Sequence, residues 1–161
     1  MNIKKAEEKL GEARLRLHQM IEQDSLLFPD QAKLNAYLNG FLAAGRTVRN
    51  QFPTQAIKAW EANLTPDEAL LWEFMRKERN RDQHKGRPRR RVKNKKIEVG
   101  IGSTASDKSG TLSAMGSPWA GPAHTLKPTS YLTIGGTERK ATEACREYLA
   151  LLELMVEALK S

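Results

Sequence analysis

Residues 78–86, near the middle of the chain, combine the side chains needed to hold a phosphate and to move a proton. Arg79 and Asn80 are followed by His84. A guanidinium binds phosphate through paired hydrogen bonds, and a histidine titrating near neutral pH can accept or release a proton. Residues four apart share one face of a helix, so Asn80 could orient the imidazole or the phosphate. The spacing predicts a catalytic group of Arg79, Asn80 and His84.

Helix geometry places a condition on this group. At about 100° and 1.5 Å per residue, Arg79 and His84 start roughly 140° apart around a helix and about 7.5 Å apart along it. The two residues therefore do not share a face. A single site requires the arginine to reach round the helix, the last turn to distort, or a second protomer to complete it.

A basic run follows the motif directly. It holds eight cations and no acid, and removing them from the 27 basic residues leaves 19, equal to the 19 acidic residues. Positive charge concentrated in one segment favours a polyphosphate partner, whereas a solvated loop is the simpler alternative. The predicted nucleic-acid-binding residues are Lys85, Arg87, Arg89, Arg90, Arg91, Lys93, Lys95 and Lys96.

Composition limits the class of protein. A chain of 161 residues, 39% apolar, is expected to form one domain with a single core. The charged N-terminal pattern is unlike a signal peptide and no apolar run reaches membrane-spanning length, which predicts a cytoplasmic protein. The one cysteine, Cys145, rules out an internal disulfide and is expected to pack in the core. No cofactor is expected, and no cluster of His, Asp and Glu has metal-ligand spacing.

Apolar residues at helical spacing predict four long helices and one short helix. Asp30 is the expected N-cap of the second helix, within which Gly40 and Gly45 are expected to allow close approach of a neighbour. The third helix begins at a capping box, Thr65 to Glu68. Its buried face is expected to hold Leu70, Leu71, Phe74 and Met75, with Trp72 at the side. The ranges are 2–24, 31–51, 54–62, about 65–85, and a last helix with Thr137 as its N-cap.

Glycine, proline, serine and threonine dominate much of the segment at about 87–136, which predicts an insertion that is mostly not helical. Residues 96–101 and 130–134 have the composition of strands that could pair. The predicted fold is all-α: a four-to-five-helix up-down bundle with a small β-hairpin-like arm inserted between the last two long helices.

The order of helices, with the sequence from Arg79 to His84 at the end of the third, resembles the HEPN superfamily. The signature of that family is an arginine, four to six residues, then a histidine, commonly with a polar residue after the arginine, as Asn80 is here. The segment 42–48 also resembles the second helix of such proteins, where small residues pack under the site. The resemblance implies one HEPN-like domain over 1–161 and a symmetric homodimer with a composite cleft.

In that setting the residue types predict metal-independent RNA cleavage by 2′-hydroxyl attack, leaving a 2′,3′-cyclic phosphate and a 5′-hydroxyl. Family members often serve as toxins of toxin–antitoxin pairs or as defence effectors. The resemblance therefore implies two partners, RNA and an antitoxin protein. Two alternatives stay open: a non-catalytic RNA-binding or regulatory module on the same scaffold, and a purely structural helical dimer.

Overall fold

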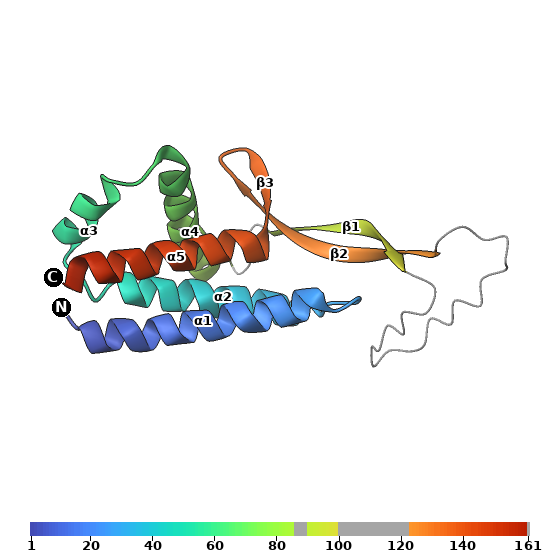
Figure 1. The fold of residues 1–161 in the computed structure, drawn as a ribbon, viewed down its shortest axis with the longest axis horizontal. Helices are drawn as coiled ribbons and strands as arrows, with labels where there is room; N and C mark the ends of the chain where they lie inside the picture. Colours follow the sequence, from blue (N-terminus) through green and yellow to red (C-terminus); the bar gives the residue numbers. More distant parts are fainter. Residues whose placement is uncertain (86–89, 100–122, 161) are drawn as a thin grey trace.

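The structure, a computed structural model, describes residues 1–85, 90–99 and 123–160, and side chains at 1–78, 90–94 and 127–160. Helices dominate the described chain, and a small antiparallel sheet of three strands extends from one end of the helical body (Figure 1). In chain order the elements are α1 (Ile3–Ser25), α2 (Gln31–Arg49), α3 (Thr54–Glu61), α4 (Pro66–Lys85), β1 (Arg90–Val99), β2 (Ala123–Ile134), β3 (Thr137–Lys140) and α5 (Ala141–Lys160).

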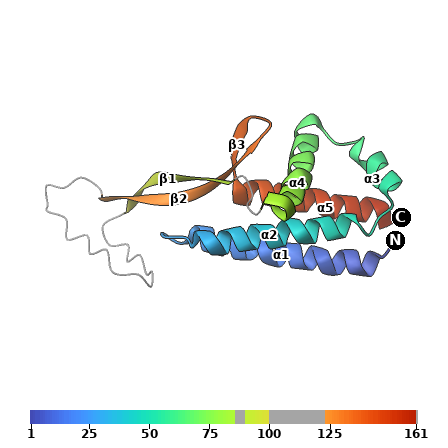
Figure 2. The same ribbon diagram turned by 180° about the vertical axis from the view of Figure 1, so that it is seen from behind.

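The core lies between α1, α2 and α5, which run side by side in both views (Figures 1 and 2). Their apolar residues recur every three or four positions, so each helix turns one stripe inward and buries it. Cys145 is fully buried in this core, as expected, and burial raises the pKa of its thiol. The largest fully buried side chains on these three helices are Met20, Leu34, Leu38, Phe41, Val48, Leu152, Met155 and Val156.

The third long helix, α4, departs from the expected up-down arrangement. In both views α4 runs across the other long helices instead of alongside them (Figures 1 and 2). Its buried apolar residues are Leu71, Trp72 and Met75, all in its first half, so this helix has too short an apolar stripe to pack lengthwise. The expected buried face was wrong at two positions, because Leu70 is 48% exposed and Trp72 only 3%.

Helix starts follow the capping signals in the sequence. The Asp30 carboxylate accepts hydrogen bonds from the backbone N–H groups of Ala32 and Lys33 at the start of α2. At α4 the Glu68 carboxylate accepts from the Thr65 backbone N–H at 2.8 Å, and the Thr65 hydroxyl accepts from the Glu68 N–H at 3.4 Å. The predicted capping box is therefore confirmed.

The arm is larger than expected and its pairing differs from the expected one. Strands β1 and β2 pair antiparallel from Arg90 opposite Leu132 to Val99 opposite Ala123, so the two predicted segments lie in neighbouring strands but not opposite each other. Gly135 and Gly136 have positive φ angles of 56° and 84° and reverse the chain into β3. Thr137 consequently begins a strand, and its assignment as the N-cap of the last helix was wrong.

Gly45 and Gly11 provide a matched test of helix packing. A Cβ at Gly45 would stand 3.0 Å from Tyr148 Cε1 and 3.1 Å from Leu152 Cδ1 of α5, whereas a Cβ at Gly11 meets nothing within 4 Å. Both alanine variants gain helix propensity, so their difference reports packing. Gly11→Ala is expected to raise the free energy of unfolding by about 0.5–1 kcal/mol, and Gly45→Ala to be less stable than Gly11→Ala by about 1–3 kcal/mol. Urea denaturation measures both, and equal stability would contradict the close approach of α2 and α5.

Candidate functional site

The sequence motif lies on the last two turns of α4. This helix is continuous to Lys85, which confirms that His84 stands in its last turn and that Asn80 and His84 are one helical turn apart. The side chains of Arg79, Asn80 and His84 lie outside the described residues, as do those of Lys85, Arg87, Arg89, Lys95 and Lys96. Their arrangement as a site therefore stays a prediction.

Three members of the predicted basic run have described side chains, and each contacts a polar group of the protein. Arg90 donates to the Ser130 hydroxyl at 2.7 Å and to the backbone oxygen of Gln31 at 3.3 Å, which ties β1 to the start of α2. Burial lowers the pKa of Arg90. Lys93 and Arg91 both pair with the Glu138 carboxylate on β3. Arg90 thus holds the sheet against the helices, while Arg91 and Lys93 stay largely exposed to solvent.

A cleft rich in cations lies between α2, α3 and α4, with α5 beneath it. Its volume is about 380 Å³, within the range of small-ligand sites. Among the side chains that the structure describes, four cations line it, against one carboxylate, that of Glu61. The four cations are Arg46, Arg49, Lys58 and Arg76.

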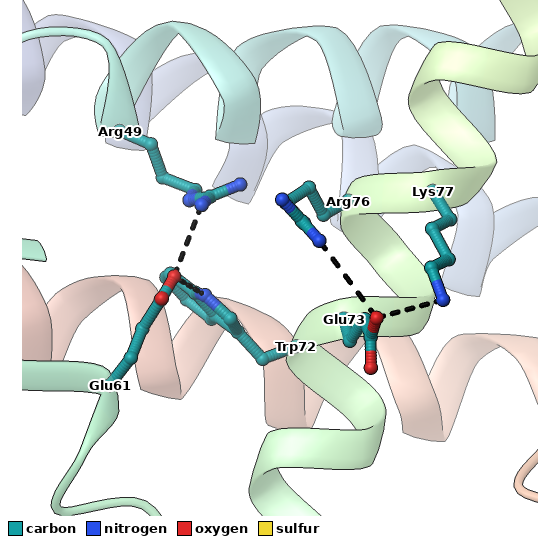
Figure 3. A network of polar contacts seen from close by, with 6 residues as sticks. All are labelled: Arg49, Glu61, Trp72, Glu73, Arg76 and Lys77. Atoms are coloured by element: carbon teal, nitrogen blue, oxygen red, sulfur yellow. Dashed lines mark hydrogen bonds and ion pairs between the residues drawn. The ribbon is translucent and has the colours of Figure 1, made fainter. Parts of the chain in front are cut away.

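Arg49, Glu61 and Trp72 form a network at one wall of this cleft, shown in Figure 3. Glu61 Oε1 accepts from the Trp72 indole Nε1 at 2.6 Å and pairs with Arg49 Nη2 at 3.2 Å. The Arg49 guanidinium also lies 4.9 Å from the centre of the Trp72 ring, a cation–π contact. One carboxylate oxygen therefore links α2, α3 and α4.

Aromatic rings support the network from below. Trp72 packs against Trp60 with ring centres 4.9 Å apart and against Tyr148 of α5 with ring centres 5.2 Å apart. Phe41 meets the edge of the same tyrosine at 6.0 Å. Burial raises the pKa of Tyr148, so its phenol stays neutral at physiological pH.

The opposite wall of the cleft is formed by α4. Arg76 points toward the space beside Arg49 (Figure 3), and its contact with Glu73 is long, at 3.9 Å. Lys77 Nζ pairs with the same carboxylate, at 2.7 Å from Glu73 Oε1. Among the residues that the structure describes, Lys58 pairs with no carboxylate. The positive charge of Arg76 and Lys58 is therefore largely uncompensated.

Arg46 and Arg49 lie in the last turn of α2 and Lys58 in the last turn of α3, where a cation suits the helix dipole. That local signal does not indicate that these cations meet Glu61 and Arg76, which approach them only in the folded chain. The cleft could therefore not be recognised from the sequence.

Comparison of the chain with protein-family models, curated proteins and solved structures returned no match. Within the described ranges, no three or more His, Cys, Asp and Glu side chains gather as a group that could hold a metal ion. None of the described helices is both long and apolar enough to cross a membrane.

Glu61→Gln tests the network. The amide can still accept from Trp72, but Arg49, whose side chain is only 16% exposed, loses its counter-charge. We expect the free energy of unfolding to fall by about 1–3 kcal/mol, measured by chemical denaturation. Glu73→Gln is the matched control, because its partners are exposed, and should change stability by about 0.5 kcal/mol or less. Equal effects would show that the network is only a surface ion pair.

Proposed function

We propose that this protein is an RNA-binding endoribonuclease of the HEPN type, which cleaves RNA without a metal ion through Arg79, Asn80 and His84. The observation that carries the proposal is the continuity of α4 from Pro66 to Lys85. Asn80 and His84 are thereby one turn apart on a helix that ends four residues before the basic strand β1 begins. A phosphodiester held by that basic segment would lie next to the motif.

The surroundings of α4 supply positive charge on both sides of the motif. Arg76 stands one turn before Asn80 and lines the basic cleft, and β1 follows with Arg91 and Lys93 exposed. Fixed cations near a scissile phosphate raise the local concentration of RNA and stabilise charge that develops in the transition state. This distribution supports a nucleic-acid substrate over a neutral one.

The chemistry follows from the residue types. One His84 takes the proton from a ribose 2′-hydroxyl, whose oxygen attacks the adjacent phosphorus and forms a 2′,3′-cyclic phosphate. The bond to the 5′-oxygen breaks, and a second proton donor protonates that leaving group. Arg79 holds the non-bridging oxygens. Because Arg79 and His84 start on different faces of α4, a homodimer that places two copies of the motif at one cleft would supply both the base and the acid.

A non-catalytic RNA-binding module is the second candidate. The basic cleft favours it, because the described cations there could hold phosphate groups with no proton-transfer residue among them. Under this reading the protein binds RNA in a salt-sensitive manner and leaves it intact. An antitoxin protein is expected as a partner only if the protein is a ribonuclease that acts as a toxin.

Cleavage of labelled RNA by the purified protein in excess chelator separates the two candidates. The wild-type chain should cut RNA, and Arg79→Ala and His84→Ala should each lower the rate by about 10²- to 10⁴-fold, because each removes a group that acts in the transition state.

His18→Ala is the control for this experiment. His18 is an exposed residue of α1 that pairs with Glu22 at 3.2 Å, so the variant should cut RNA at the wild-type rate. If Arg79→Ala and His84→Ala both still cleave RNA at the wild-type rate, the catalytic roles of these two residues are contradicted. Binding without cleavage would favour the second candidate.

A further inference from the structure

We propose that the cleft between α2, α3 and α4 is a binding site for a single phosphate group, carried by a nucleotide or by RNA, and that Lys58 and Arg76 are its principal ligands. These ligands are residues other than Arg79, Asn80 and His84, and phosphate binding by them does not require cleavage. The proposal rests on charge, on unused hydrogen-bond donors and on the size of the cleft.

Charge gives the first argument. Of the five described charged side chains that line the cleft, four are cationic, and among the described residues Lys58 pairs with no carboxylate and Arg76 approaches one only at 3.9 Å. The one carboxylate, Glu61, already accepts from Trp72 and pairs with Arg49, so its charge is largely compensated. Cations held close together in a folded protein repel one another, and an anion between them removes that repulsion.

Unused donors give the second argument. The single described hydrogen bond of Arg49 runs from Nη2 to Glu61, and its buried Nε has no acceptor among the described residues. Among the described residues, the one ion pair of Arg76 is the long contact to Glu73. A guanidinium offers five N–H donors in one plane, a geometry that matches phosphate oxygens. Asn50 and Thr54, which also line the cleft, add neutral donors.

Rigidity and size give the third argument. Arg49 is held over the Trp72 ring, which in turn packs on Trp60 and Tyr148, so the wall of the cleft is formed before a ligand arrives. A volume of about 380 Å³ admits a phosphate together with an attached sugar. Inorganic phosphate alone would fill only part of it.

Two sources could deliver such a phosphate: a free mononucleotide and an RNA strand. Isothermal titration calorimetry with adenosine 5′-monophosphate, and with a short 2′-O-methyl RNA carrying either a 5′-phosphate or a 5′-hydroxyl, distinguishes them. The 2′-O-methyl group removes the attacking hydroxyl, so binding is measured without cleavage. If the 5′-phosphorylated strand binds more tightly, the ligand is the phosphate at an RNA end. If both strands bind equally, the ligand is an internal phosphate of RNA. If the mononucleotide alone binds, the ligand is a free nucleotide.

The double variant Lys58→Gln, Arg76→Gln tests the site itself. Losing two charge-assisted contacts should weaken binding of the tightest probe by about tenfold or more. Both side chains lie at the cleft and outside the core cluster, so the fold should be retained, which circular dichroism verifies.

Lys77→Gln is the matched control, since it removes one cation from the same helix but from a position that does not line the cleft. It should change affinity by about twofold or less. The proposal is overturned if no probe binds the wild-type chain, or if Lys77→Gln weakens binding as much as the double variant does. The ribonuclease proposal is tested by cleavage, and this one by binding of probes that cannot be cut, so their failures give different results. A chain that binds the probes but cuts no RNA contradicts only the ribonuclease proposal, and a chain that cuts RNA but binds no probe contradicts only this one.

Discussion

The contact on which the arrangement of α2, α3 and α4 depends is that of Glu61 Oε1 with the Trp72 indole and the Arg49 guanidinium. Trp72 is the buried anchor of a helix whose apolar stripe covers only its first half. This polar link adds to the buried contacts of Leu71 and Met75 in fixing the position at which α4 crosses the other helices. The second half of α4, which carries the motif, is followed along the chain by the basic strand β1 (Figure 1).

The same contact connects packing with charge. Because Glu61 is already engaged with Arg49 and Trp72, it offers little counter-charge to Lys58 and Arg76. An anion bound between these two side chains would supply that charge. Arg76 lies one turn before Asn80 on α4, so the proposed phosphate site and the proposed catalytic group would follow one another along one helix.

Local signals in the sequence predicted the helices and, except for α5, their starts, because each depends on residues close together in the chain. Examples of such local signals are the N-cap at Asp30, the capping box that begins at Thr65, and the continuous apolar stripe of α1. The crossing of α4 and the third strand were missed because they depend on distant packing and on the Gly135–Gly136 turn. Charges in β1 and Pro128 within β2 also concealed the alternation that marks strands. The cleft was not predictable, since its charged residues come from three different helices.

Analysis of the RNA ends is the most direct test of the account. RNA incubated with the wild-type protein in excess chelator is compared with the same RNA carrying a 2′-deoxy nucleotide at the cleavage position. The account predicts a 2′,3′-cyclic phosphate and a 5′-hydroxyl from the first and no cut at that position in the second. Cleavage of the deoxy substrate there, or products ending in a 5′-phosphate, would contradict the roles given to Arg79 and His84.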